Sequence, residues 1–248
     1  MATGFEAKDR ALLRLSGADC ESFLQDLISN DVTRDGLVYA ALLSPQGKYL
    51  FDFFVLSLDG AWLIDVASER AQALAQRLSL YKLRADVTIE ASDVRVFQIW
   101  ESDLGHPDPR HDALGRRLYA SDAPQMSPFD AWEALRIAHL IPKTGVELIA
   151  DQSFILECHF ERLNGVDFKK GCYVGQEVTA RMKHKTELRK GLARVSLEGS
   201  AEPGAEILAD GKVAGTLHSV HKGHGIAYLR FDRATGEMRA GDATVRRV

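Results

Sequence analysis

Cysteine is scarce in this chain: only three occur in 248 residues, at positions 20, 158 and 172. The number is odd, the three lie far apart, and no two form a C-x-x-C pair. This usage argues against a disulfide framework and is typical of free thiols in a reducing compartment. The sequence therefore predicts a cytoplasmic protein that needs no disulfide to hold its core.

Long apolar runs and an excess of one charge are also missing. No stretch reaches the roughly 18 consecutive apolar residues of a membrane span, and the first residues do not resemble a signal peptide. The formal net charge of −4 argues against a general nucleic-acid binder. A local basic stretch from 183 to 194, with Lys183, Lys185, Arg189 and Lys190, leaves nucleic acid as a possible but not favoured partner. No Walker loop, Rossmann fingerprint or nucleophile elbow is present.

The first part of the chain predicts helices mixed with antiparallel strands. Ser16 or Asp19 is suited to cap a helix with apolar positions 23, 24, 27 and 28, and Ser68 to cap a second helix. The sequence Ser44-Pro45-Gln46-Gly47 has type I turn chemistry, and Asp59-Gly60 indicates a hairpin. The predicted strands cover 38–43, 49–58, 61–66, 86–90 and 94–100. A surface loop follows at 106–115 and a helix at 128–139.

After about residue 187 the pattern changes to short strands separated by turns such as Asp210-Gly211 and Lys222-Gly223. Strands of this length and spacing predict a small β-barrel or sandwich. The predicted domains are 1–186 and 187–248, with the boundary placed at Glu187. The predicted strands of the second domain cover 192–197, 206–208, 212–219, 225–231 and 243–248.

The most informative segment runs from Lys169 to His184 and contains Lys170-Gly171-Cys172-Tyr173-Val174-Gly175-Gln176-Glu177. The spacing of Glu177 and Arg181 predicts a helix that begins near Gly175. Cys172 would then precede the helix, close to Lys169, Lys170 and the positive end of the helix dipole. Such surroundings favour a reactive thiolate. The alternative interpretation is a buried, inert cysteine, which is the usual fate of an isolated one.

This segment resembles the K-G-C-Y-x-G-Q-E signature of the YgfZ family. The resemblance extends over nearly the whole chain, through the segments at 15–32, 43–48, 108–115 and 135–142. That family is similar in fold to the T-protein of the glycine cleavage system, a tetrahydrofolate-dependent aminomethyltransferase. The resemblance implies an α+β folate-binding domain of two related halves followed by a small C-terminal β-barrel. It also implies tetrahydrofolate or a derivative as cofactor, bound near Asp52, Lys170, Gly171, Cys172, Tyr173, Gly175, Gln176, Glu177 and Arg181.

The resemblance places Asp52 at the position of the T-protein's catalytic aspartate. A carboxylate among Leu50, Phe51 and Phe53 is a plausible acid or base, and the alternative is an outward-facing strand residue. Two positions depart from the T-protein pattern: Ala138 replaces the glutamate that holds the pterin ring, and Val66 replaces an asparagine. Because pterin N–H groups need a carboxylate, folate binding is expected to be no better than micromolar. Whether the chain is an enzyme stays open.

His218, His221 and His224 recur every three residues, a pattern that can bind zinc. The preferred interpretation is a strand entering a turn, in which this spacing separates the histidines onto different faces. No metal site is therefore predicted.

Three hypotheses about function remain. The first is a folate-linked factor for iron–sulfur cluster assembly or repair, with Cys172 as nucleophile, transient ligand or redox-sensitive group and with iron–sulfur client or assembly proteins as partners. The second is a tetrahydrofolate-dependent aminomethyltransferase with Asp52 as acid or base. The third is a tRNA-modification factor that acts through the basic stretch at 183–194 and is sensitive to salt.

Overall fold

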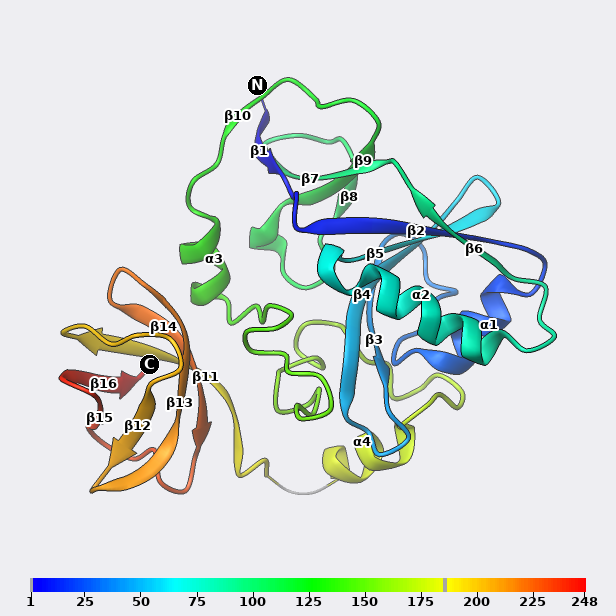
Figure 1. Ribbon diagram of the computed structural model, residues 1–248. Helices are drawn as coiled ribbons and strands as arrows, with labels where there is room; N and C mark the ends of the chain where they lie inside the picture. Colours follow the sequence, from blue (N-terminus) through cyan, green and yellow to red (C-terminus); the bar gives the residue numbers. More distant parts are fainter. Residues whose placement is uncertain (1, 185–186) are drawn as a thin grey trace. The chain divides into compact units, whose positions relative to one another are not determined.

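A computed structural model describes residues 2–184 and 187–248 (Figure 1). The chain forms two compact units, Met1–Phe129 with Glu161–Gln176, and Asp130–Phe160 with Glu177–Val248. Both units are discontinuous in sequence. The predicted domains, 1–186 and 187–248, stay a proposal, because their boundary falls beside Lys185 and Thr186, which lie outside the described residues.

The first unit is built around a five-stranded antiparallel sheet in the order β3-β4-β5-β2-β6. Its strands are β2 (Arg10–Ser16), β3 (Val38–Leu43), β4 (Tyr49–Leu58), β5 (Ala61–Ala67) and β6 (Thr88–Ser92). The predicted turn chemistry is confirmed: the N–H of Gly47 donates to the Ser44 carbonyl at 2.8 Å. At the next turn Asp59 and Gly60 have φ of 50° and 75°, as a tight hairpin requires.

Helices α1 (Cys20–Leu27) and α2 (Ser68–Lys82) cover one face of this sheet, as Figure 1 shows. Apolar residues at helical spacing fill the layer between them, including Phe23 and Leu24 of α1 and Leu74 and Leu78 of α2. Asp19 is the N-cap residue of α1, as predicted, although its side chain makes no cap bond. The predicted cap of the second helix is wrong, because Ser68 is itself the first residue of α2.

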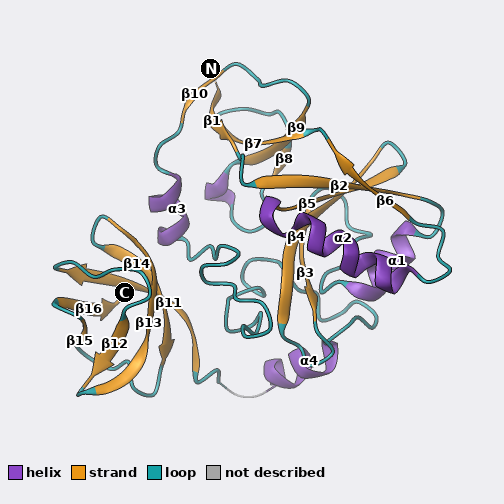
Figure 2. Cartoon of the chain, viewed as in Figure 1, coloured by secondary structure: helices purple, strands orange, loops and turns teal. Residues whose placement is uncertain are grey.

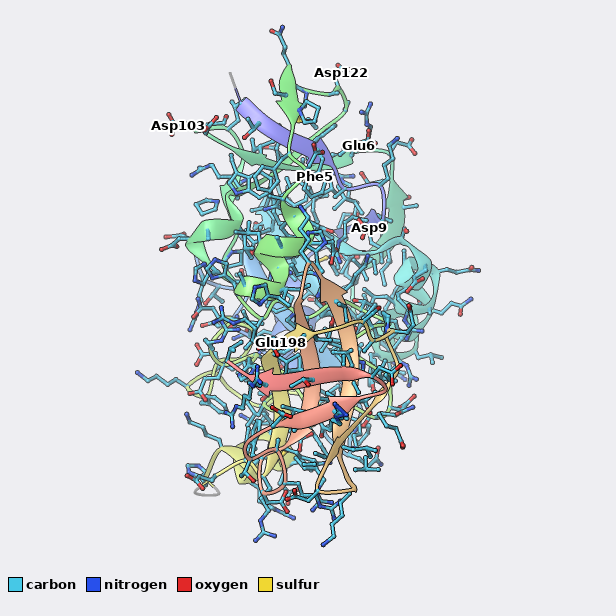
Figure 3. All side chains as sticks on the ribbon, turned by 90° about the vertical axis from the view of Figure 1, so that its left-hand side faces the viewer. Phe5, Glu6, Asp9, Asp103, Asp122 and Glu198 are labelled. Carbon is cyan, nitrogen blue, oxygen red and sulfur yellow. The ribbon has the colours of Figure 1, made fainter. Side chains whose placement is uncertain are left out.

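A second five-stranded sheet of the same unit has the order β10-β1-β7-β9-β8. Its strands are β1 (Ala2–Glu6), β7 (Arg95–Trp100), β8 (His106–Pro107), β9 (Arg116–Ala120) and β10 (Met126–Pro128). Figure 3 shows Phe5 and Glu6 on β1, with Asp103 and Asp122 on loops of this sheet and lying apart from one another. A 3-10 turn, η1 (Asp112–Leu114), lies between β8 and β9.

The second unit contains a closed six-stranded barrel in the order β11-β14-β13-β12-β15-β16. Its strands are β11 (Lys190–Glu198), β12 (Glu206–Ala209), β13 (Lys212–His221), β14 (His224–Arg230), β15 (Met238–Ala240) and β16 (Ala243–Arg247). The barrel prediction is confirmed, although sequence reasoning missed the short β15. Side chains such as Val195, Leu217 and Leu229 fill its interior.

Two helices complete the chain, α3 (Trp132–Ala138) and α4 (Gln176–His184). The predicted helix at 128–139 starts too early, because residues 126–128 pair with β1. Between the two helices, residues 140–175, all of them described, run as turns and irregular loop (Figure 2). Among the described residues, no helix is both long and apolar enough to cross a membrane.

Candidate functional site

Three attachments hold the segment that leads to Cys172 against the loop after α1. The N–H of Asp167 donates to the Ser29 carbonyl at 2.9 Å, and the Asp167 carboxylate pairs with Arg34. Partial burial raises the pKa of Asp167, but the Lys169 N–H and the Arg34 charge outweigh it and hold that pKa below its ordinary value. The amide of Asn30 donates to the Asn164 carbonyl at 2.7 Å.

Lys170 anchors the same segment most firmly. Its Nζ lies 2.7 Å from the carbonyl oxygens of Gln25 and Ile28 and 3.0 Å from that of Asn30. The residue is 8% exposed, and burial lowers its pKa to about 8. Because an ammonium has three N–H donors, these carbonyls use all of them. The predicted roles of Lys170 in binding a ligand or in activating the neighbouring thiol stay predictions.

Cys172 lies on the surface, whereas Cys20 and Cys158 are buried. Gly171 beside it is exposed, and a Cβ at that position would meet no atom within 4 Å. Tyr173 on the other side is buried, with its ring 5.4 Å from the Lys170 Nζ. The exposed Cys172 thiol therefore lies between two buried residues, Lys170 and Tyr173. Burial and the charges of Asp86 and Asp19 raise the pKa of Cys20, so that thiol is held in its neutral form.

Gly175 fixes the other end of the loop that contains Cys172, residues 171–175, which is called the cysteine loop below. Its φ is +82°, and a Cβ there would lie 2.6 Å from the Ser44 carbonyl oxygen and 2.9 Å from the Leu43 Cβ. Only glycine tolerates both conditions, so the loop packs directly on the β3–β4 turn. The Gln176 side chain donates to the Gly171 carbonyl at 3.3 Å, which bridges the loop around Cys172.

The predicted helix after the cysteine is present as α4. Arg181 and Glu177 form the expected ion pair at 3.0 Å, but their side chains are 65% and 86% exposed. Pairs this exposed contribute little to stability. The predicted ligand-binding roles of Gly171, Cys172, Tyr173, Gly175, Gln176, Glu177 and Arg181 stay predictions.

Asp52 is a buried carboxylate on β4 and not an outward-facing strand residue. It is 4% exposed, and its two oxygens accept from the hydroxyls of Tyr49 at 2.7 Å and Tyr39 at 3.0 Å. Burial and the nearby Asp52 charge raise the pKa of Tyr39 well above its ordinary value, so that phenol keeps its proton. Asp52 therefore accepts a hydrogen bond from the neutral Tyr39 phenol, and its role as acid or base stays a prediction.

A second buried polar cluster packs on Phe54, the residue that shares a face of β4 with Asp52. The Asp65 carboxylate accepts from Arg117 at 2.6 Å and from Arg10 at 2.6 Å. The Arg117 guanidinium lies 4.1 Å from the Phe54 ring centroid and that of Arg110 4.8 Å. Although burial raises the pKa of Asp65, its two arginine partners hold it below the ordinary value. Sequence reasoning missed this cluster.

The loop predicted at the surface around 106–115 belongs partly to this buried cluster. Asp108 is 3% and Arg110 is 7% exposed, and the pair makes two hydrogen bonds of 3.0 and 2.7 Å. The surface-loop prediction is therefore wrong for these two residues. Pro and charged residues indicated a solvated turn, but the two charges neutralise each other and can be buried together.

The second unit has its own buried ion pair. Arg136 of α3 donates to Glu147 at 3.2 Å and to the Ser219 hydroxyl of β13 at 2.6 Å. These contacts attach α3 to the barrel. Ala138, two residues further along, is exposed at the last position of α3 and offers no carboxylate.

The histidines lie where a strand enters a turn, as predicted, but the predicted separation onto different faces is wrong for two of them. The turn at Lys222 and Gly223 places His221 directly opposite His224, so these two share a face. Even so, among residues 2–184 and 187–248 no group of three or more His, Cys, Asp or Glu is arranged to hold a metal ion.

The described residues of the basic stretch at 183–194 belong to more than one element. Lys183 lies on α4 and Arg194 on β11, where it donates to the Ala138 carbonyl at 3.2 Å. Lys185 lies outside the described residues. The role of this stretch in nucleic-acid binding stays a prediction without structural support.

The fold and the barrel resemble known proteins. The aminomethyltransferase T of the glycine cleavage system from Bartonella henselae superposes with a TM-score of 0.74 at 13% identity, covering 100% of this chain and 84% of that one. Residues 189–248 match the family model described as the CAF17 C-terminal beta-barrel domain. The chain therefore has the T-protein-like α+β fold with a C-terminal barrel, as predicted.

Comparison with sequence relatives identifies the family within this fold class. The mitochondrial iron–sulfur cluster assembly factor IBA57 of Mus musculus is 30% identical over 285 residues, covering 95% of this chain and 80% of that protein. The IBA57 homolog of Mycosarcoma maydis is 32% identical over 231 residues, which cover 78% of this chain and 57% of that protein. The chain thus spans little more than half of that fungal relative. It belongs to the IBA57 family.

The predicted cytoplasmic location is wrong by this comparison. The relatives from Mus musculus and Mycosarcoma maydis are both named as mitochondrial proteins. Free thiols indicated a reducing compartment, but cysteine usage does not distinguish between the compartments that meet that condition. The finer resemblance to the YgfZ family stays a prediction.

Proposed function

We propose that this protein acts in iron–sulfur cluster assembly and that Cys172 is the residue through which it acts. The names of its relatives support the process, and one structural observation supports the residue. Of the three cysteines, Cys172 alone is exposed. Iron–sulfur clusters are held by cysteine thiolates, and a buried thiol without an opening cannot reach a cluster carried by another molecule.

Because the chain offers a single exposed thiolate, the role of Cys172 in cluster binding is restricted. A cluster needs about four protein ligands, and this chain offers one exposed cysteine, so it cannot retain a cluster alone. We therefore assign Cys172 as an exchangeable ligand, with the other thiolates supplied by an iron–sulfur assembly or client protein. Lys170 and Gly175 keep the loop in place while the cluster, as cargo, is handed on.

Chemical reconstitution tests this assignment. The chain is incubated anaerobically with ferrous iron, sulfide and glutathione, which supplies the missing thiolates, and iron retained after gel filtration is measured. Wild type and Cys158→Ser, which removes a buried thiol, are expected to retain iron. Cys172→Ser is expected to retain none. If Cys172→Ser retains as much as wild type, the cysteine is not a cluster ligand.

The fold also suggests tetrahydrofolate as a small-molecule partner, but the residues present fit it only in part. Asp52 lies in an aromatic, buried setting that suits a pterin, yet Tyr39 and Tyr49 already bond to both of its oxygens. Ala138 supplies no carboxylate for the pterin N–H groups. We expect a dissociation constant no better than about 1 μM, and no step of the proposed mechanism uses the folate. Calorimetry that shows no heat at millimolar tetrahydrofolate would remove it as a partner.

A further inference from the structure

A cleft of about 360 Å³ opens in the second unit. Its volume is near the lower end of the ~300–1,000 Å³ typical of small-molecule sites. All of its lining residues come from α3, from β11 and from the hairpin between β13 and β14. The cleft therefore lies wholly within one compact unit.

Three of the lining residues are apolar and belong to α3. Ala134, Ile137 and Ala138 are spaced by three and four residues, so they share one face of α3. Ile137 is 2% exposed, whereas the two alanines are exposed. The short alanine side chains leave a hollow over the helix that a larger apolar group can fill.

The other lining residues come from the barrel and carry nitrogen-containing side chains. Lys222 and the facing pair His221 and His224 come from the hairpin tip, which the Leu197 N–H fixes by donating to the Gly223 carbonyl at 2.8 Å. Arg194 donates to the last carbonyl of α3, that of Ala138, at 3.2 Å. That bond uses one of the five N–H donors of the guanidinium and holds the group at the edge of the cleft.

The geometry points to a binding site for a small amphipathic anion, a molecule with an apolar body and a carboxylate or phosphate head. The body packs on Ala134 and Ala138, and the head accepts hydrogen bonds from Arg194 and Lys222. Charge complementarity carries the assignment, because the lining residues, all of them described, include the cations Arg194 and Lys222 and no carboxylate. Guanidinium and ammonium groups form their strongest hydrogen bonds with such heads. This site goes beyond the proposed cluster chemistry and does not involve Cys172.

Fluorescence titration with anilinonaphthalene sulfonate, an aromatic anion, tests the site in the full-length chain. Bound probe should be displaced by octanoate or octyl phosphate, whichever head is preferred, and about tenfold less well by octanol or octylamine, because only the anions gain charged hydrogen bonds. Equal displacement by octanol and by both anions would overturn the proposal.

Substitutions inside and outside the cleft test where the probe binds. Ala138→Leu fills the hollow and should weaken probe binding about tenfold, whereas Ala131→Leu, at the N-cap of the same helix and outside the cleft, should not. The double variant Arg194→Gln, Lys222→Asn should lose the preference for anions, and Asn suits the left-handed backbone at 222. Lys212→Gln, on β13 but outside the cleft, is the matched control. All variants should melt as wild type does. Probe binding that Ala138→Leu leaves unchanged in a folded chain would also overturn the proposal.

Discussion

At the scale of single residues, exposure distinguishes the three cysteines. Timed labelling with iodoacetamide and mass spectrometry should therefore modify Cys172 before Cys20 and Cys158. The thiol of Cys172 is open to the reagent, while burial both shields that of Cys20 and raises its pKa. In urea the three should label at similar rates, which controls for intrinsic reactivity. Labelling of Cys172 last in the native chain would contradict its exposure.

Lys170 and Lys169 are neighbours with opposite surroundings. Lys170→Met removes a buried ammonium from three carbonyls and leaves them unpaired, so the free energy of unfolding should fall by about 2–4 kcal/mol. Lys169 is exposed, and Lys169→Met should change it by less than about 0.5 kcal/mol. Urea unfolding measures both. If the two variants are equally stable, the three hydrogen bonds of Lys170 are not needed for stability.

At the scale of elements, the two glycines of the cysteine loop form a matched pair. Gly175→Ala brings a Cβ to 2.6 Å from the Ser44 carbonyl at a φ of +82°, so we expect a loss of about 1–3 kcal/mol. Gly171→Ala points a Cβ into open space and should be nearly neutral. Denaturant midpoints compare them. A neutral Gly175→Ala would mean that the loop does not depend on its contact with the β3–β4 turn.

The Asp65 cluster makes the first unit sensitive to acid. The pKa of Asp65 is lower in the folded chain than its unfolded value of about 3.9, so its contribution is complete above that pH and is lost as the pH falls through the folded pKa. Asp65→Asn should cost about 3–5 kcal/mol at neutral pH. The difference from wild type should shrink as the pH falls below about 4. A difference that is constant down to pH 2 would exclude this ion-pair explanation.

Local patterns predicted much of the fold. The β3 and β4 strands, both of their turns and the barrel followed from short strand-like runs and turn chemistry. Other features depend on contacts between distant segments. The burial of Asp108 and Arg110 depends on a partner network that includes Arg117, and the anchoring of Lys170 depends on carbonyls about 140 residues earlier in the chain. Periodicity contains no information about such contacts.

The candidate site was predictable to the extent that its motif was distinctive. The exposed Cys172 and the glycines around it could be identified from one short segment. The tyrosine partners of Asp52 could not, because Tyr39 and Asp52 lie on different strands and meet only through register. Likewise, the sequence pattern did not show that His221 and His224 face each other, because this arrangement requires a two-residue turn that reverses the strand.

At the scale of the whole molecule, the predicted and the proposed function assign the chemistry to different residues. The resemblance to the T-protein gave Asp52 as a predicted acid or base, whereas the exposed thiol supports the proposed role of Cys172. Asp52→Asn keeps its shape and both tyrosine neighbours, and Cys172→Ala removes only a surface thiol. Both variants should therefore fold, and a comparison of the two separates a cluster-assembly factor from an aminomethyltransferase.

The most direct test is complementation of cells that lack their own IBA57-family protein, with iron–sulfur enzyme activities measured in extracts. Wild type and Asp52→Asn should restore these activities, and Cys172→Ala, expressed at the same level, should not. If Cys172→Ala restores the activities fully and Asp52→Asn does not, the result contradicts this account and assigns the chemistry to the buried carboxylate of Asp52.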